Sequence, residues 1–86
     1  MVNSPGAGGP PSCRLDQLRP GDRCVIQGID GAPSVVRRLM ELGLVPGTPV
    51  ELVRKAPFGD PFELIVRGTH LSLRRSEAGY VHVEPV

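Results

Sequence analysis

Two hydrophobic periods meet in residues 33–55, which read PSVVRRLMELGLVPGTPVELVRK. In the first half an apolar side chain recurs at i, i+4 and i+7, which is the spacing of one helical face: Val35, Leu39 and Leu42. Pro33 or Ser34 can open this helix, and Gly43 stands where a left-handed C-terminal cap belongs. The first half therefore predicts a helix over 33–42 that buries the three apolar side chains.

The second half of this stretch predicts a strand. Pro46-Gly47 is a turn signal, and it leads into residues 49–55, in which Val50 and Leu52 alternate with more polar neighbours. The same alternation predicts one further strand before this stretch and three after it: 22–29, 62–67, 70–74 and 80–84. Gly28 marks a bulge in the first of these. Residues 15–18 and 75–79 each predict a single helical turn.

Short strands in succession with tight connections are typical of a small barrel. The sequence therefore predicts a mainly all-β fold, a partly open antiparallel barrel of about five strands with one short α-helix. Residues 1–12, MVNSPGAGGPPS, are rich in Pro and Gly and bury too little apolar surface to order themselves, so we expect a flexible leader there. The barrel domain is expected to occupy residues 13–86.

Composition argues against several classes of partner. Ten basic and nine acidic side chains leave a formal net charge of +1, and the arginine pairs have acids nearby. A nucleic-acid binder would carry a clustered basic excess, and aromatic residues for base stacking make up only 3% of the chain. No apolar run approaches the roughly 20 residues that cross a bilayer. We therefore expect a cytoplasmic protein that reaches a membrane only through a partner and binds no nucleic acid.

The sequence shows no constellation for catalysis or metal binding. Neither of the two histidines, His70 and His82, can be placed beside a nucleophile from one sequence. The aspartates sit next to turn signals, and no glycine-rich segment has the phosphate-loop pattern. Cys13 and Cys24 match no metal-ligand spacing. We therefore expect no enzyme, no cofactor and no metal site.

Three motifs in order carry a resemblance to a known family: LDQLRPGDRCVI (15–26), RRLMELGLVPGTPVELVRKAPFGDP (37–61) and VRGTHLSLRRSEAGYVHV (66–83). Together they resemble the ferrous iron transport protein A family, FeoA. The resemblance implies an SH3-like barrel with one helix and a cytosolic accessory role in bacterial ferrous iron uptake. It implies as partner the cytosolic GTPase domain of the membrane transporter FeoB, which the protein would bind and modulate.

The positions that match the family around the helix end are the candidate partner-binding residues: Arg38, Leu39, Leu42, Gly43, Leu44, Pro46 and Gly47. Leu44 is expected to lie exposed at the corner, where an apolar side chain can serve a partner. A helix face, a cap and a turn explain the same residues through the fold alone, so both readings stay open. Weak homo-oligomerisation also stays open. The alternative function is a regulatory or peptide-binding SH3-like barrel that acts on an iron-dependent transcriptional regulator.

Overall fold

The structure is a computed structural model that describes residues 12–86. Its elements follow in the order β1 (Cys13–Arg14), η1 (Leu15–Gln17), β2 (Arg23–Ile29), α2 (Pro33–Glu41), β3 (Pro49–Lys55), η2 (Pro57–Gly59), β4 (Phe62–Val66), β5 (Thr69–Leu73), α3 (Arg75–Ala78) and β6 (Val81–Pro85). All but the last residue of the expected leader lies outside the described residues. In the described part of the chain, no helix is long and apolar enough to cross a bilayer.

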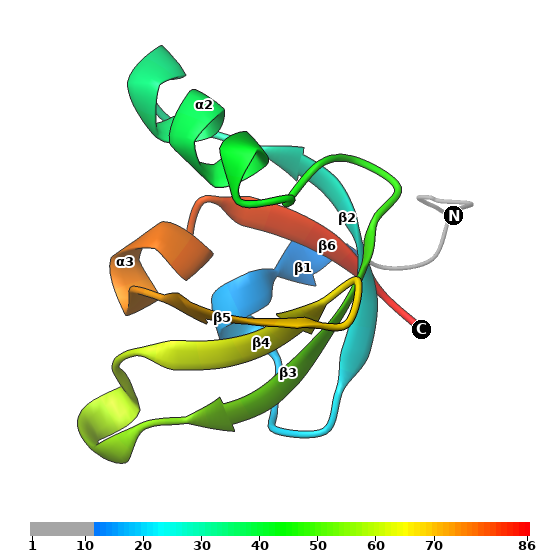
Figure 1. The fold of residues 1–86 in the computed structure, drawn as a ribbon, viewed down its shortest axis with the longest axis vertical. Coiled ribbons are helices and arrows are strands. Elements are labelled where there is room, and N and C mark those ends of the chain that lie inside the picture. Colours follow the sequence, from blue (N-terminus) through cyan, green and yellow to red (C-terminus); the bar gives the residue numbers. More distant parts are fainter. Residues whose placement is uncertain (1–11) are drawn as a thin grey trace, which may run out of the picture.

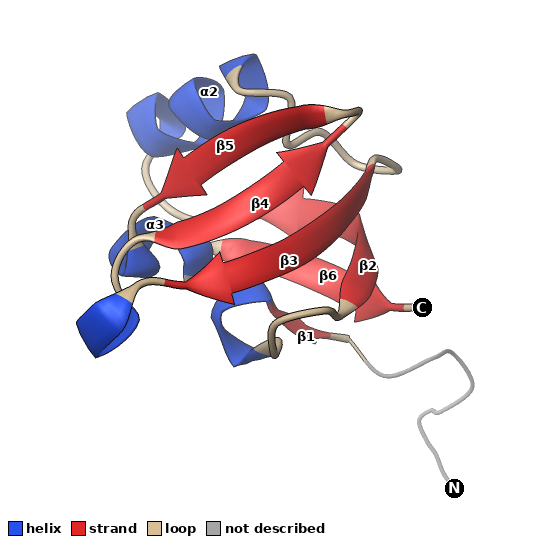
Figure 2. Cartoon of the chain, turned by 60° about the horizontal axis from the view of Figure 1, so that its bottom comes forward, coloured by secondary structure: helices blue, strands red, loops and turns tan. Residues whose placement is uncertain are grey.

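The six strands form one antiparallel sheet in the order β1-β6-β2-β3-β4-β5. The sheet curls, so that β3, β4 and β5 form one wall and β6, β2 and β1 the other (Figure 2). Strand β2 belongs to both walls, because it pairs with β3 and with β6. Figure 1 shows α2 standing over one end of the barrel and α3 at its side. The expected all-β barrel with one principal helix is confirmed.

The alternating apolar residues of the strands form the core, as the sequence predicts. Every second residue of β4 is buried, and the inward residues of β2, β3 and β6 join them in one cluster: Cys24, Ile26, Val50, Leu52, Phe62, Leu64, Val66, Val81 and Val83. The first helical turn contributes Leu15 and Leu18. A strand whose apolar side chains repeat every second residue can bury one face only, so this period fixes which face points inward.

Two bulges adjust the register of the walls. The pairing of β2 with β6 shifts between Ile26 and Gly28, as the glycine predicts, and Ile29 packs against the core beyond it. A second shift between Leu52 and Arg54 in β3 has no glycine to signal it. Bulges bend a strand and raise its twist, which helps a narrow sheet curl into a barrel.

Two expectations about the elements are corrected. The helix ends at Glu41, one residue earlier than expected, and a sixth strand, β1, pairs with β6 through Cys13 and Arg14. A two-residue strand has too few positions to show an alternating pattern, so periodicity cannot reveal it.

Candidate partner-binding site

The expected corner after α2 is only partly exposed. Leu39 and Leu44 are completely buried, and Gly43 is half-buried. Leu42 is 38% exposed, and Arg38, Pro46 and Gly47 also face solvent. The expectation that Leu44 lies exposed is therefore wrong, and so is the expectation that Leu42 is buried with Leu39.

The cap of α2 explains both corrections. The amide of Gly43 donates to the carbonyl of Met40 at 2.9 Å, and the amide of Leu44 donates to the carbonyl of Leu39 at 3.2 Å. These two bonds, with Gly43 at φ +103°, make a Schellman motif. In that motif the residue after the glycine folds back against the last turn of the helix. Leu44 consequently enters the core beside Leu39, and Leu42, the last residue with helical dihedrals, is left at the rim.

A second apolar stripe on α2 faces away from the barrel. Val36 is half-buried, and Met40, four residues later, is 37% exposed. Together with Gly31, Pro33, Arg37 and Glu41 they line a shallow hollow of about 580 Å³. The i, i+4 spacing of Val36 and Met40 is present in the sequence beside the longer stripe that includes Leu39. We call Val36 and Met40 the α2 face.

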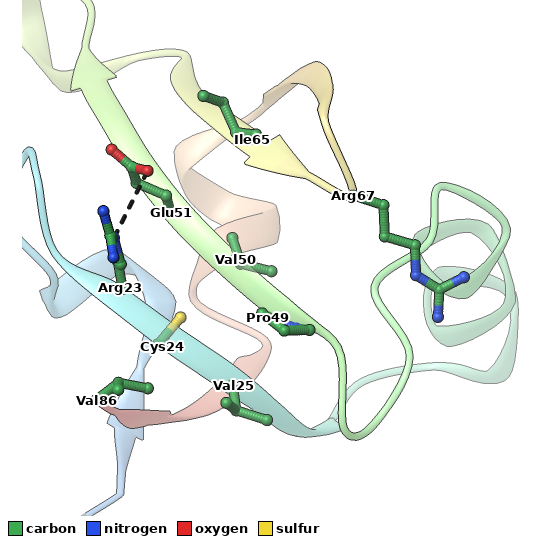
Figure 3. Close-up of a pocket in the computed structure, with 9 residues that line it drawn as sticks. All are labelled: Arg23, Cys24, Val25, Pro49, Val50, Glu51, Ile65, Arg67 and Val86. Atoms are coloured by element: carbon green, nitrogen blue, oxygen red, sulfur yellow. Dashed lines mark ion pairs between the residues drawn. The ribbon is translucent and has the colours of Figure 1, made fainter.

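Another apolar groove lies on the outer surface of β2, β3 and β4. It is lined by the outward-facing Val25, Pro49 and Ile65, by Val86 and by the core residues Cys24 and Val50, and it has a volume of about 440 Å³. In Figure 3, Arg23 stands at one end of the groove and pairs with Glu51, at 3.9 Å, while Arg67 stands at the other end. The lining is mostly apolar, with Arg23, Glu51 and Arg67 as its charged side chains, so the groove is suited to binding an apolar group.

The most exposed apolar side chain of the described residues lies in the loop after β3. Phe58 is 100% exposed and has φ +68°, a left-handed conformation that non-glycine residues adopt rarely. The turn-forming residues of APFGDP (56–61) predict only a loop, and no expectation from the sequence singles out Phe58. Its signal was a phenylalanine between proline and glycine, outside every apolar period.

Several ionisable side chains connect different elements of the fold. Glu77 is buried; one carboxylate oxygen accepts the amide of Arg74 at 3.0 Å, and the other pairs with Arg38 on α2. His82 pairs with Asp30. Among residues 12–86 no group of three or more His, Cys, Asp or Glu side chains could hold a metal ion.

The two cysteine thiols are poor nucleophiles in this setting. Burial raises the pKa of the Cys24 thiol to about 11, and it also raises the pKa of Cys13. Only the thiolate attacks an electrophile or binds a metal, so both side chains stay in the unreactive form at neutral pH. Cys24 lies in the core and acts there as a small apolar residue.

The fold is a small SH3-like barrel. Its described residues form two apolar surfaces, on α2 and on β2–β4, that a partner can contact. The FeoA domain profile matches residues 13–85, and the chain therefore belongs to the FeoA family, a family of accessory domains associated with ferrous iron transport. A relative from Porphyromonas gingivalis, an Fe(2+) transport protein A/Fe(2+) transporter FeoB fusion protein, is 35% identical over 71 residues. These are 83% of this chain but only 8% of that relative.

Solved structures agree with this placement. The FeoA protein of Chlorobium tepidum is 40% identical with a TM-score of 0.80, and the match covers 86% of this chain and 70% of that one. The FeoA of Stenotrophomonas maltophilia, an SH3 domain protein solved with zinc, is 34% identical with a TM-score of 0.73, covering 84% and 89%. A manganese-dependent transcriptional repressor reaches a TM-score of 0.82 at 20% identity, covering 95% of this chain and 48% of that one. That last likeness shows the fold alone.

Proposed function

We propose that this chain is a non-catalytic, cytoplasmic accessory protein of ferrous iron uptake that binds the cytosolic GTPase domain of a FeoB-type transporter and modulates it. The observation that carries the proposal is the Porphyromonas gingivalis relative, in which a domain like this one and the transporter belong to one polypeptide. A covalent link raises the effective concentration of one domain at the other. Such a fusion is useful when the two domains act on each other, and a separate chain must reach the same contact through its own surface.

The α2 face is the surface that we propose for this contact. Val36 and Met40 leave apolar area in solvent along one side of a helix whose position is fixed by buried Leu39. A rigid helix with exposed apolar side chains can enter a groove of a partner with little loss of conformational entropy. Of the corner residues expected from the sequence, Arg38, Leu42, Gly43, Pro46 and Gly47 remain direct candidates. Leu39 and Leu44 support them from beneath.

The test is the affinity of the full chain for the purified cytosolic domain of the transporter from the same organism, with and without a GTP analogue. Met40→Glu should weaken binding by about 2 kcal/mol, which is about thirtyfold, if the side chain is an anchor. The fold should survive, because Met40 is outside the core. The melting temperature of the variant, followed by circular dichroism, checks this.

The matched control is Phe58→Glu, which places the same charge at another exposed apolar position. We expect its affinity to equal that of the wild type. Equal losses in both variants would mean that added negative charge, and not the α2 face, decides binding. Undiminished binding by Met40→Glu would place the interface elsewhere, and no binding by the wild type would refute the proposed function itself.

A further inference from the structure

Strand β5 has an open side. It is the last strand in the sheet order, so it pairs with β4 on one side, and no strand of the described residues pairs with the other. The β4–β5 turn consists of Arg67 at φ +52° and Gly68 at φ +78°, as in a two-residue type I′ hairpin. The edge therefore ends in a defined turn, and its register along β4 is fixed.

This register decides which backbone groups are open. In a two-residue hairpin the residues flanking the turn, here Val66 and Thr69, exchange both backbone hydrogen bonds, and such pairs then alternate along the ladder. Leu71 and Leu73 accordingly bond to β4. His70 and Ser72 direct their N–H and C=O groups away from it.

Nothing in residues 12–86 uses these open groups. The turn, loop, cap and side-chain hydrogen bonds of the described chain do not involve the backbone of His70 or Ser72, and both side chains are exposed. Leu71, between them, points to the core but stays half-buried at this edge. The edge thus offers two donors, two acceptors and an incompletely covered leucine.

The charge around this edge is positive. Arg67 precedes β5, Arg74 and Arg75 follow it, and none of the three is in an ion pair with any described residue. Two nearby acids are already engaged: Glu63, opposite Ser72, pairs with Arg54 at 3.2 Å, and Glu77 pairs with Arg38. Asp60 accepts the backbone amide of Arg75 at 3.1 Å and its carboxylate offsets one of these charges, which leaves a net positive charge beside the strand.

We propose that the open edge of β5 accepts an extended, acidic segment of a partner protein as an added strand. The added strand would bond to the backbone of His70 and Ser72, cover Leu71 with an apolar residue and direct acidic residues toward Arg74 on the outer face. A second copy of this chain fits less well. Two antiparallel β5 edges would bring Arg67 of one chain near Arg74 of the other, and like charges opposite each other destabilise a sheet. The inference does not depend on which protein supplies the segment.

The probe is an acetylated and amidated peptide of alternating glutamate and valine, seven residues long, added to the full ¹⁵N-labelled chain. We expect the amide signals of His70 and Ser72 to shift and their hydrogen exchange to slow, because both N–H groups become bonded. The same peptide with lysine in place of glutamate should bind at least about tenfold more weakly, since it meets arginines of like charge.

Two variants test the two parts of the proposal. Ser72→Pro removes an outward N–H and no bond to β4, and proline is tolerated where the strand faces solvent. It should abolish the effect, while Ser72→Ala, which keeps the N–H, should bind as the wild type does. Arg74→Glu should weaken binding about tenfold, because it reverses one charge beside the added strand.

Several results would overturn the inference. These are equal binding of the two peptides, unchanged binding by Ser72→Pro, shifts confined to the α2 face, or no shift at about 1 mM peptide. If Ser72→Pro fails to fold, the exchange rates of His70 and Ser72 in the wild type decide instead. A dimer whose β5 amides become protected on concentration would make a second copy the occupant and refute the acidic one.

Discussion

Truncation of Leu44 is the sharpest test of the helix cap. Leu44 is completely buried, in one core cluster with Leu39, and a β-carbon on the neighbouring Gly43 would lie 3.6 Å from Val66. A cavity opened here is walled by a capped helix and by the end of β4, neither of which can move in easily. Leu44→Ala should therefore cost about 3–5 kcal/mol, near the upper end for such changes.

The matched control is Leu42→Ala, two residues earlier and chemically identical. Leu42 is 38% exposed, so its truncation removes less buried area and leaves an opening that water can fill. We expect it to cost about 1 kcal/mol. A larger loss in Leu44→Ala supports the structure, in which Leu44 is buried. A larger loss in Leu42→Ala would support the sequence-based expectation, in which Leu42 is core and Leu44 is exposed.

The assay is thermal and urea unfolding of both variants. In a domain of this size 1 kcal/mol shifts the melting temperature by about 4–8 °C, so Leu44→Ala should lose roughly 12–40 °C and Leu42→Ala about 4–8 °C. The dependence of the free energy on urea should be the same in both, since the folded state stays equally compact. Equal melting temperatures, or a larger loss in Leu42→Ala, would refute the assigned cap.

Three further predictions concern single side chains. Because the thiol of Cys24 has its pKa raised to about 11 in the folded state, its contribution to stability is complete below about pH 8.5 and is lost as pH rises toward 11. Urea titrations should show a fall on the order of 3 kcal/mol over that range, absent in Cys24→Ala. Gly43→Ala should lower the melting temperature by the equivalent of about 1–2 kcal/mol because of its positive φ, whereas Gly28→Ala, with φ outside that region and open space around it, should change stability by less than about 0.5 kcal/mol. Glu77→Ala should cost about 1–3 kcal/mol in thermal unfolding, because it leaves Arg38 and a capped amide without their acceptor.

Most of the barrel could be predicted because its strands are buried on one face. The alternation of apolar residues predicts which side of β2, β3, β4 and β6 points inward. Gly28 predicts the bulge that keeps Ile29 on the core side. The bulge between Leu52 and Arg54 could not be predicted, since it depends on how β3 bends to follow β4. The same holds for β1, whose two residues are ordered by the edge of β6.

The candidate site was harder to predict than the fold, for a physical reason. A helical period indicates which residues share a face but does not indicate whether that face meets the core or solvent. Val35, Leu39 and Leu42 share a period, yet only Leu39 is completely buried: Val35 is half-buried, and Leu42, the last residue with helical dihedrals, is 38% exposed. The glycine cap did contain the missing information: a Schellman motif sends its following apolar residue inward, which places Leu44 in the core.

One buried carboxylate, that of Glu77, contacts both helix α2 and the residue that follows β5. Glu77 accepts the amide of Arg74, directly after β5, and pairs with Arg38 on α2. A partner carboxylate that draws Arg38 into a new ion pair takes away the charged partner of Glu77. The buried Glu77 carboxylate then keeps only its bond to the Arg74 amide, which is costly. A partner that contacts α2 is therefore expected to leave the Arg38–Glu77 pair intact.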